Sequence, residues 1–136
     1  MFILWRLQQI FYKTPEGREY ALRAAVMIRE NPSGVSKDTL EKLGELCISR
    51  DISEGEEIVY TAMRGEDPTA APTLLQARHH SSIGQWSSGE RKASHLARAL
   101  DLYRQVLAAE PENCQARNGI ANILSIQKRD DPNILV

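Results

Sequence analysis

The side chains best suited to chemistry in this chain are its histidines, cysteines and a group of glutamates. His79 and His80 are adjacent, so a helix would point them to different sides, and His95 follows only after a turn-like stretch. This spacing does not supply the three or four ligands that a structural or catalytic zinc ion needs. We therefore predict packed or solvated histidines and no metal site.

The cysteines and glutamates also lack partners for catalysis. Cys47 occupies an apolar position of a helical pattern, and Cys114 lies next to a helix start. Glu54, Glu56 and Glu57 fall at a predicted, exposed helix start, where carboxylates suit the helix dipole. Glycine-rich phosphate loops, zinc-protease motifs and nucleophile elbows are absent from the sequence. We expect a protein that is not an enzyme and has no cofactor.

Composition restricts the class of protein further. The chain has 136 residues, 17 Lys and Arg against 18 Asp and Glu, and a formal net charge of -1. This length suits a single domain, and the balanced charge excludes a disordered tail or a strongly basic nucleic-acid carrier. Two cysteines are too few for a disulfide framework, so we expect a cytoplasmic protein, without a membrane-spanning segment.

Proline-centred stop signals divide the chain into helical pairs. Pro32, Pro68 and Pro111 each follow one helical pattern and precede another. No segment alternates apolar and polar residues as a half-buried strand would, so the predicted fold class is all-α. Gly44 lies inside a predicted helix, where glycine is unfavourable, and this indicates a close contact with a second helix.

Side-chain caps are expected at four predicted helix starts. Ser36 or Asp38 can cap the helix that contains Gly44. Ser53 with Glu56, and Ser87 with Glu90, have the spacing of capping boxes, and Asn113 can cap the last helix.

The segment 37–68 resembles the tetratricopeptide repeat, through an apolar, small and apolar pattern on its first helix and a Met then Pro at its end. The residues that carry the resemblance are Leu40, Leu43, Gly44, Cys47, Met63 and Pro68. The resemblance implies a helix-turn-helix solenoid of about three and a half repeats. The repeats are about 1–34, 37–68, 70–111 with an insertion near 86–90, and a half repeat at 113–129.

Residues 74–84, which read LLQARHHSSIG, resemble a segment of the interferon-induced proteins with tetratricopeptide repeats. His79, His80, Ile83 and Gly84 carry this match. The resemblance implies a role in innate antiviral defence and binding of viral RNA ends in a basic tunnel. Residues 78–104 hold 5 Lys and Arg against 2 Asp and Glu. An RNA site would use Arg78, Arg91, Lys92, Arg98 and Arg104.

The other expected function, which carries more weight, is a protein-interaction scaffold, since it requires only the solenoid. In a tetratricopeptide array, first-helix residues line the concave face. They are Asp38, Glu41 and Glu45 in the second repeat and Gln115, Asn118 and Asn122 in the fourth. The carboxylates of Glu41 and Glu45 would repel an acidic ligand, so we expect a basic or neutral peptide.

Both ends of the chain carry apolar residues without a polar cap. Leu4, Trp5, Leu7 and Phe11 lie near one end, and residues 134–136 at the other. A repeat array with such ends is expected to assemble with another chain, as a homo- or hetero-oligomer.

Overall fold

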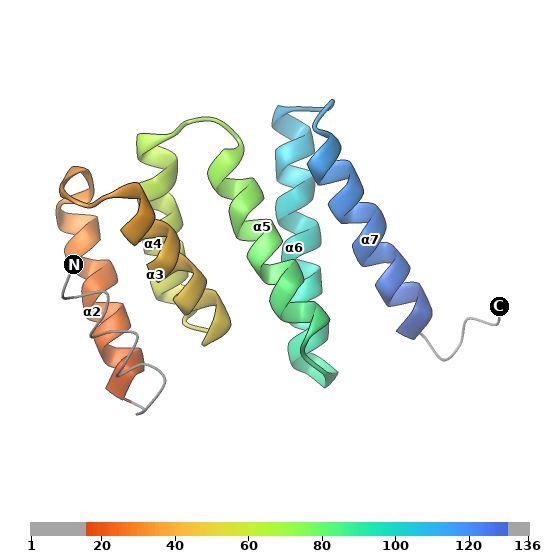
Figure 1. Ribbon diagram of the computed structural model, residues 1–136, viewed down its shortest axis with the longest axis horizontal. Coiled ribbons are helices and arrows are strands. Elements are labelled where there is room, and N and C mark those ends of the chain that lie inside the picture. The colour runs from red at the N-terminus through yellow and green to blue at the C-terminus, as the bar shows by residue number, and fades with distance from the viewer. Residues whose placement is uncertain (1–15, 131–136) are drawn as a thin grey trace. The chain divides into compact units, whose positions relative to one another are not determined.

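The structure is a computed structural model that describes residues 16–130. Within that range every regular element is a helix and no strand occurs, so the all-α prediction is confirmed for this part of the chain (Figure 1). None of the described helices combines the length and the apolar character needed to cross a bilayer. The apolar residues near both ends, and with them the predicted oligomer contacts, lie outside the described range.

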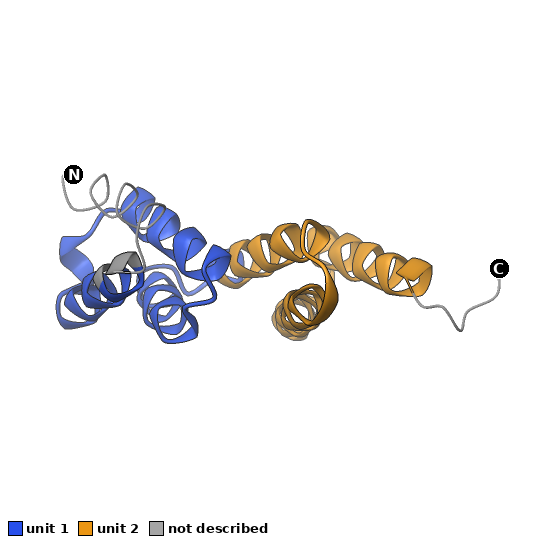
Figure 2. Cartoon of the chain, turned by 90° about the horizontal axis from the view of Figure 1, so that it is seen from below, with its two compact units in different colours: residues 1–72 blue, residues 73–136 orange. Residues whose placement is uncertain are grey.

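The helices form two compact units, residues 1–72 and residues 73–136 (Figure 2). The described helices of the first unit are α2 (Glu16–Glu30), the short 3-10 helix η1 (Pro32–Gly34), α3 (Lys37–Ser49) and α4 (Ser53–Glu66). The second unit contains α5 (Ala71–Gln85), which begins two residues before the boundary, α6 (Gly89–Ala109) and α7 (Cys114–Asp130).

In the first unit, α2 and α3 both pack against α4. The buried face of α2 repeats at intervals of three, one and three residues, which is the period of one helix face. It consists of Ala21, Ala24, Ala25 and Ile28. Leu43, Cys47 and Ile48 of α3 meet Val59 and Tyr60 of α4 in a core from which water is almost fully excluded. The small alanine side chains let the backbones of α2 and α4 approach closely.

The α3–α4 connection shows why this pair forms a tight antiparallel hairpin. Ser36 caps α3, as predicted, because its hydroxyl accepts a hydrogen bond from the backbone N–H of Thr39 at 3.2 Å. At the other end Asp51 adopts a φ of 59°, and the N–H of Ile52 donates to the carbonyl of Cys47 at 2.8 Å. This is the left-handed C-terminal motif that satisfies the last helical carbonyls.

The predicted capping box of α4 is wrong. Ile52 occupies the N-cap position and Ser53 is already the first helical residue, so its hydroxyl is not placed to cap. Arg18 of α2 instead secures the turn, since its guanidinium donates to the carbonyls of Arg50 and Asp51 at 3.5 and 3.3 Å. Three helices of the first unit are thus joined at one end.

In the second unit, α6 packs against α7 and contacts α5. The insertion expected near 86–90 is a turn of three residues, 86–88, and α6 itself is 21 residues long. The predicted Ser87 cap is wrong, because the Ser87 hydroxyl donates to the carbonyl of Ile83 at 2.6 Å and Ser88 takes the N-cap position. Asn113 caps α7 as predicted, accepting from the N–H of Ala116 at 2.9 Å.

Candidate functional site

The carboxylates predicted for a partner surface lie together on α3. Asp38, Glu41 and Glu45 are separated by three and four residues, so they lie on one side of the helix, and Asp38 and Glu45 are exposed while Glu41 is half-buried. Among residues 16–130, none of the three makes an ion pair or a hydrogen bond through its side chain. We call these three residues the α3 carboxylate surface. It is a net negative surface that the fold leaves accessible, with the exposed Lys42 as one cation on the same side of the helix.

Tyr60 lies behind this surface, on α4. Its ring packs against Gly44 so closely that a Cβ atom built on that glycine would meet ring carbons at 2.8 and 3.0 Å and the hydroxyl at 3.1 Å. This contact confirms the predicted reason for glycine inside α3. Burial first, and then the negative charge of Glu56, Glu45 and Glu41, raise the pKa of Tyr60. The charges of the surface therefore act on the tyrosine behind them.

Glu56 is not an exposed helix-start residue, as the sequence suggested, but is buried on α4. It lies four residues before Tyr60, on the same face of the helix, and this face packs against α3. Burial, followed by the charge of Glu56, raises the pKa of the Cys47 thiol to about 12. Cys47 is therefore a protonated core side chain with no nucleophilic character at neutral pH.

The neutral half of the predicted concave surface lies on α7 of the other unit. Gln115, Asn118 and Asn122 are all exposed and lie along one side of that helix. The amide groups can donate and accept hydrogen bonds but carry no charge. They form a second exposed polar surface, separate in the chain from the α3 carboxylate surface.

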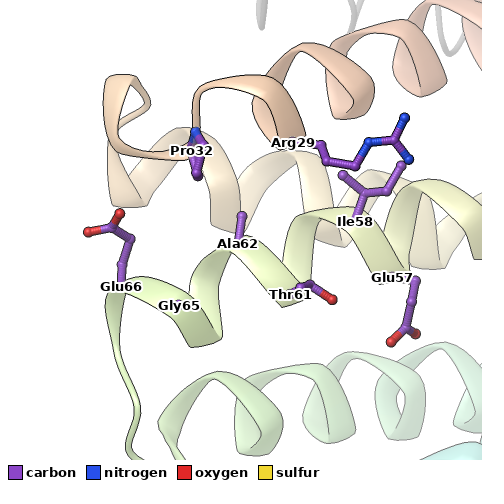
Figure 3. A pocket seen from close by; sticks show the side chains of 8 residues that line it. All are labelled: Arg29, Pro32, Glu57, Ile58, Thr61, Ala62, Gly65 and Glu66. Atoms are coloured by element: carbon purple, nitrogen blue, oxygen red, sulfur yellow. The ribbon is translucent and has the colours of Figure 1, made fainter.

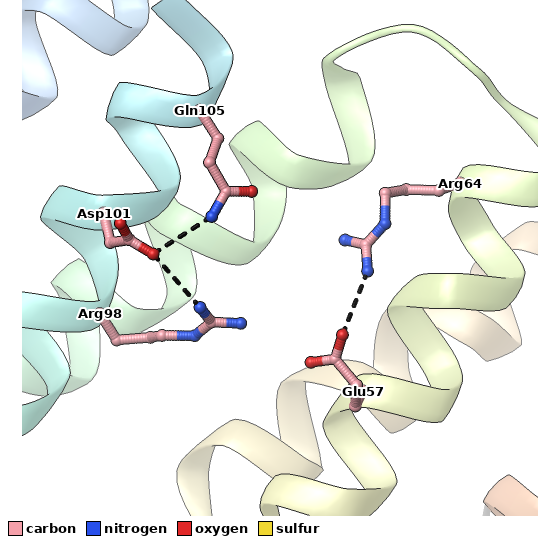
Figure 4. A network of polar contacts seen from close by, with 5 residues as sticks. All are labelled: Glu57, Arg64, Arg98, Asp101 and Gln105. Atoms are coloured by element: carbon pink, nitrogen blue, oxygen red, sulfur yellow. Dashed lines mark hydrogen bonds and ion pairs between the residues drawn. The ribbon is translucent and has the colours of Figure 1, made fainter. Parts of the chain in front are cut away.

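The five cationic residues of the RNA hypothesis do not all remain available. Lys92 of α6 forms an ion pair with Asp130 of α7 at 2.5 Å, which holds the pKa of that carboxyl below its usual range. Arg98 lies 3.6 Å from Asp101, whose carboxylate also accepts a hydrogen bond from Gln105 at 3.1 Å (Figure 4). Two of the five positive charges are therefore offset by carboxylates.

The other three cations are spread over two helices. Arg78 is exposed on α5, and its charge acts to lower the pKa of Tyr103, which burial raises. Arg91 donates to the Ser87 hydroxyl at 2.7 Å beside the α5–α6 turn. Arg104 lies about 120° around α6 from Arg98 at 100° per residue. The five cations of the RNA hypothesis therefore come from two helices and from more than one side of α6.

Two histidines meet in the core of the second unit, and the sequence did not indicate that they would. The Nδ1 atoms of His80 on α5 and His95 on α6 lie 2.8 Å apart, and both side chains are buried. One ring donates and the other accepts, which requires at least one neutral imidazole. Two nitrogens bound to one zinc ion would stand about 3.4 Å apart, so the distance fits a direct hydrogen bond.

No group of three or more His, Cys, Asp or Glu side chains in the described range is arranged to hold a metal ion. His79, the neighbour of His80, is half-buried and does not join the pair, as its different direction on the helix predicted.

A groove on the first unit was not predicted. It has a volume of 410 Å³ and lies between the end of α2, η1 and the second half of α4 (Figure 3). Its lining consists of Arg29, Pro32, Glu57, Ile58, Thr61, Ala62, Gly65 and Glu66. Volumes of this order are typical of ligand sites. The sequence held one hint, since glycine at position 65 leaves out a side chain at a helical position that lines the groove.

Comparison of the chain with protein-family models, with curated proteins and with solved structures found no match.

Proposed function

We propose that the protein is a non-catalytic, tetratricopeptide-type helical scaffold that binds a basic segment of a partner protein through the α3 carboxylate surface. The observation that carries the proposal is the set of three carboxylates, Asp38, Glu41 and Glu45, on one side of α3 with no cation paired to them among the described residues. A Lys or Arg side chain of a partner would supply the missing opposite charge.

Support for the repeat architecture comes from a close glycine contact in each of two helix pairs, in the middle of α3 and near the end of α5. Gly44 of α3 receives Tyr60 of α4, and Gly84 of α5 receives Leu96 of α6, each closer than a Cβ atom would allow. In both pairs a small residue on the first helix admits a large side chain of the second. That arrangement is expected for a solenoid built from repeated helix pairs, with α3 in a first-helix position.

The experiment compares basic, neutral and acidic peptides of equal length for binding to the full chain by isothermal titration calorimetry, over a series of salt concentrations. We expect the basic peptides to bind most tightly and to weaken as salt rises, because the attracting charges are exposed. The double variant Glu41→Gln, Glu45→Gln should weaken binding about tenfold. Glu54→Gln is the matched control, because it removes an exposed carboxylate on α4 outside the surface.

The alternative is the RNA-binding function implied by the resemblance to the interferon-induced family. The ion pairs of Lys92 and Arg98 make it the weaker hypothesis, since a phosphate would have to displace a carboxylate at each. Electrophoretic mobility shift with triphosphorylated RNA tests it directly. A tight complex lost on changing Arg78, Arg98 and Arg104 to Glu would overturn the scaffold proposal. The cytoplasmic location and the assembly with another chain that the sequence suggests remain predictions.

A further inference from the structure

The groove on the first unit is apolar in its middle and open to a ligand there. Ile58 and Ala62 of α4 lie on one wall, and Pro32 of η1 lies on the other (Figure 3). Gly65 contributes no side chain, and a Cβ atom built on it would have no neighbour within 4 Å. Gly65 is exposed and lies next to Glu66, so the α4 wall is low at this end and the groove opens to solvent there (Figure 3).

Opposite charges mark the two ends of the groove. Glu66 is the last residue of α4 and stands at one end, whereas Arg29, in the last turn of α2, stands at the other (Figure 3). Neither side chain makes a hydrogen bond or ion pair with the described part of the chain. The third charged residue of the lining, Glu57, already pairs with Arg64 at 3.6 Å (Figure 4). The groove thus offers one positive and one negative end.

We propose that this groove binds a short extended peptide segment of a partner protein that carries an acidic side chain at one end, an aliphatic side chain in the middle and a basic side chain at the other. The acidic group pairs with Arg29, the aliphatic group packs on Ile58 and Ala62 beside Gly65, and the basic group pairs with Glu66. Charge complementarity at two separate points selects such a segment over one of uniform charge.

This inference is independent of the proposed function, because it concerns a different surface of the same unit and a different ligand. The α3 carboxylate surface selects net positive charge, whereas the groove selects the order of two opposite charges. A basic peptide that binds α3 would meet Arg29 in the groove and be repelled there. The two proposals can therefore fail separately.

The test uses four capped tetrapeptides, acetylated and amidated so that only side chains carry charge. They are Glu-Leu-Leu-Lys, Glu-Leu-Leu-Glu, Lys-Leu-Leu-Lys and Ser-Leu-Leu-Ser. Each is titrated into the full ¹⁵N-labelled chain, and amide chemical shifts give both the location and the dissociation constant. We expect Glu-Leu-Leu-Lys to shift the amides of Thr61, Ala62 and Gly65 and to bind about fivefold more tightly than either uniformly charged peptide.

Two kinds of variant make the assignment specific. Gly65→Leu adds a large side chain to the α4 wall of the groove, next to Glu66, and should weaken binding at least tenfold, while Gly65→Ala, which adds one methyl group, should change it less. Glu66→Lys should reverse the preference, so that Glu-Leu-Leu-Glu becomes the best of the four. The control is Glu54→Lys, which alters the same net charge outside the groove and should leave the order unchanged.

Several results would overturn the proposal. One is the absence of saturable shifts at Thr61, Ala62 and Gly65; another is an unchanged peptide preference in Glu66→Lys. A third is a change from dimer to monomer in sedimentation when Gly65→Leu is introduced, because the groove would then be occupied by a second copy of the chain. A fourth is peptide binding that is lost in the double variant Glu41→Gln, Glu45→Gln but kept in Gly65→Leu. The peptides would then bind the α3 carboxylate surface, and the proposal that they bind the groove would be wrong.

Discussion

At the scale of single residues, a glycine facing a tyrosine recurs in both units. Gly44 lies against the ring of Tyr60, and Gly119 of α7 lies against the ring of Tyr103 of α6. In each case the ring belongs to a buried side chain that has no room to move. These glycines therefore allow the two helices to approach closely. The close contact is made at the expense of helix stability, because glycine inside a helix is less favourable than alanine.

Replacing Gly44 by alanine should destabilise the protein by about 1 to 3 kcal/mol, because the added methyl group overlaps the Tyr60 ring. The same substitution at Gly65, where the methyl group meets open space, should stabilise the protein by about 0.5 to 1 kcal/mol through helix propensity. Urea unfolding followed by circular dichroism measures both. Equal stability of the two variants would contradict the contact.

Cys47 and Tyr60 make the first unit sensitive to alkali. The pKa of the Cys47 thiol is raised from 9.0 to about 12, mainly by burial, and that of Tyr60 is raised for the same first cause. Because acidic groups with a raised pKa release their protons more easily in the unfolded chain, the contribution of Cys47 and Tyr60 to the free energy of unfolding should be constant below about pH 9 and fall from there to about pH 12. Circular dichroism across this range measures it.

The matched variant for the alkaline experiment is Tyr60→Phe, which keeps the ring and removes one titrating group. The free energy of unfolding of this variant should fall less steeply between pH 9 and 12 than that of the unchanged protein. A second readout is thiol labelling at neutral pH, in which exposed Cys114 should react at once and buried Cys47 only in denaturant. Labelling of Cys47 in the native chain at the rate of Cys114 would refute its burial.

At the scale of helices and their connections, caps decide where each helix begins. Ser36 and Asn113 make the cap hydrogen bond, whereas Ser53 lies one residue inside α4. Ser36→Ala and Asn113→Ala should therefore each cost about 0.5 to 2 kcal/mol of stability. Ser53→Ala should cost clearly less and serves as the control in the same urea titrations. A large loss of stability in Ser53→Ala alone would show that Ser53 caps α4 after all.

The contact between α5 and α6 includes the hydrogen bond between His80 and His95. A double-mutant cycle with His80→Phe and His95→Phe removes the hydrogen bond while keeping two rings of similar size. We expect a coupling energy of about 0.5 to 3 kcal/mol, because the two Nδ1 atoms lie 2.8 Å apart at a buried site. Additive losses, within about 0.5 kcal/mol, would mean that the two rings merely pack.

At the scale of the whole molecule, each unit has its own core. Leu43 is buried among α3 and its neighbours in the first unit, and Leu102 is buried on α6 in the second. Leu43→Ala should lower the protection of amides in α2, α3 and α4 by about 2 to 5 kcal/mol in native-state hydrogen exchange, and Leu102→Ala should act on α6 and α7. Equal loss of protection across the chain in both variants would show one cooperative unit.

The sequence by itself determined the helices. Their apolar period of 3.6, the prolines between them and the caps at Ser36 and Asn113 are local signals, which act within a few residues. The sequence also placed Asp38, Glu41 and Glu45 on one side of α3, because their spacing sets their side of the helix. The close contact at Gly44 was predicted from another local property, the unfavourable helix propensity of glycine.

Tertiary structure alone decided which residues meet between helices. His80 lies within hydrogen-bond distance of His95, and Lys92 forms an ion pair with Asp130. Glu56 is buried in the core instead of exposed to water. The groove beside Gly65 depends on three elements whose mutual positions no local pattern encodes. Helix formation is governed by neighbours along the chain, whereas these contacts and the groove follow from packing between segments that are distant in sequence.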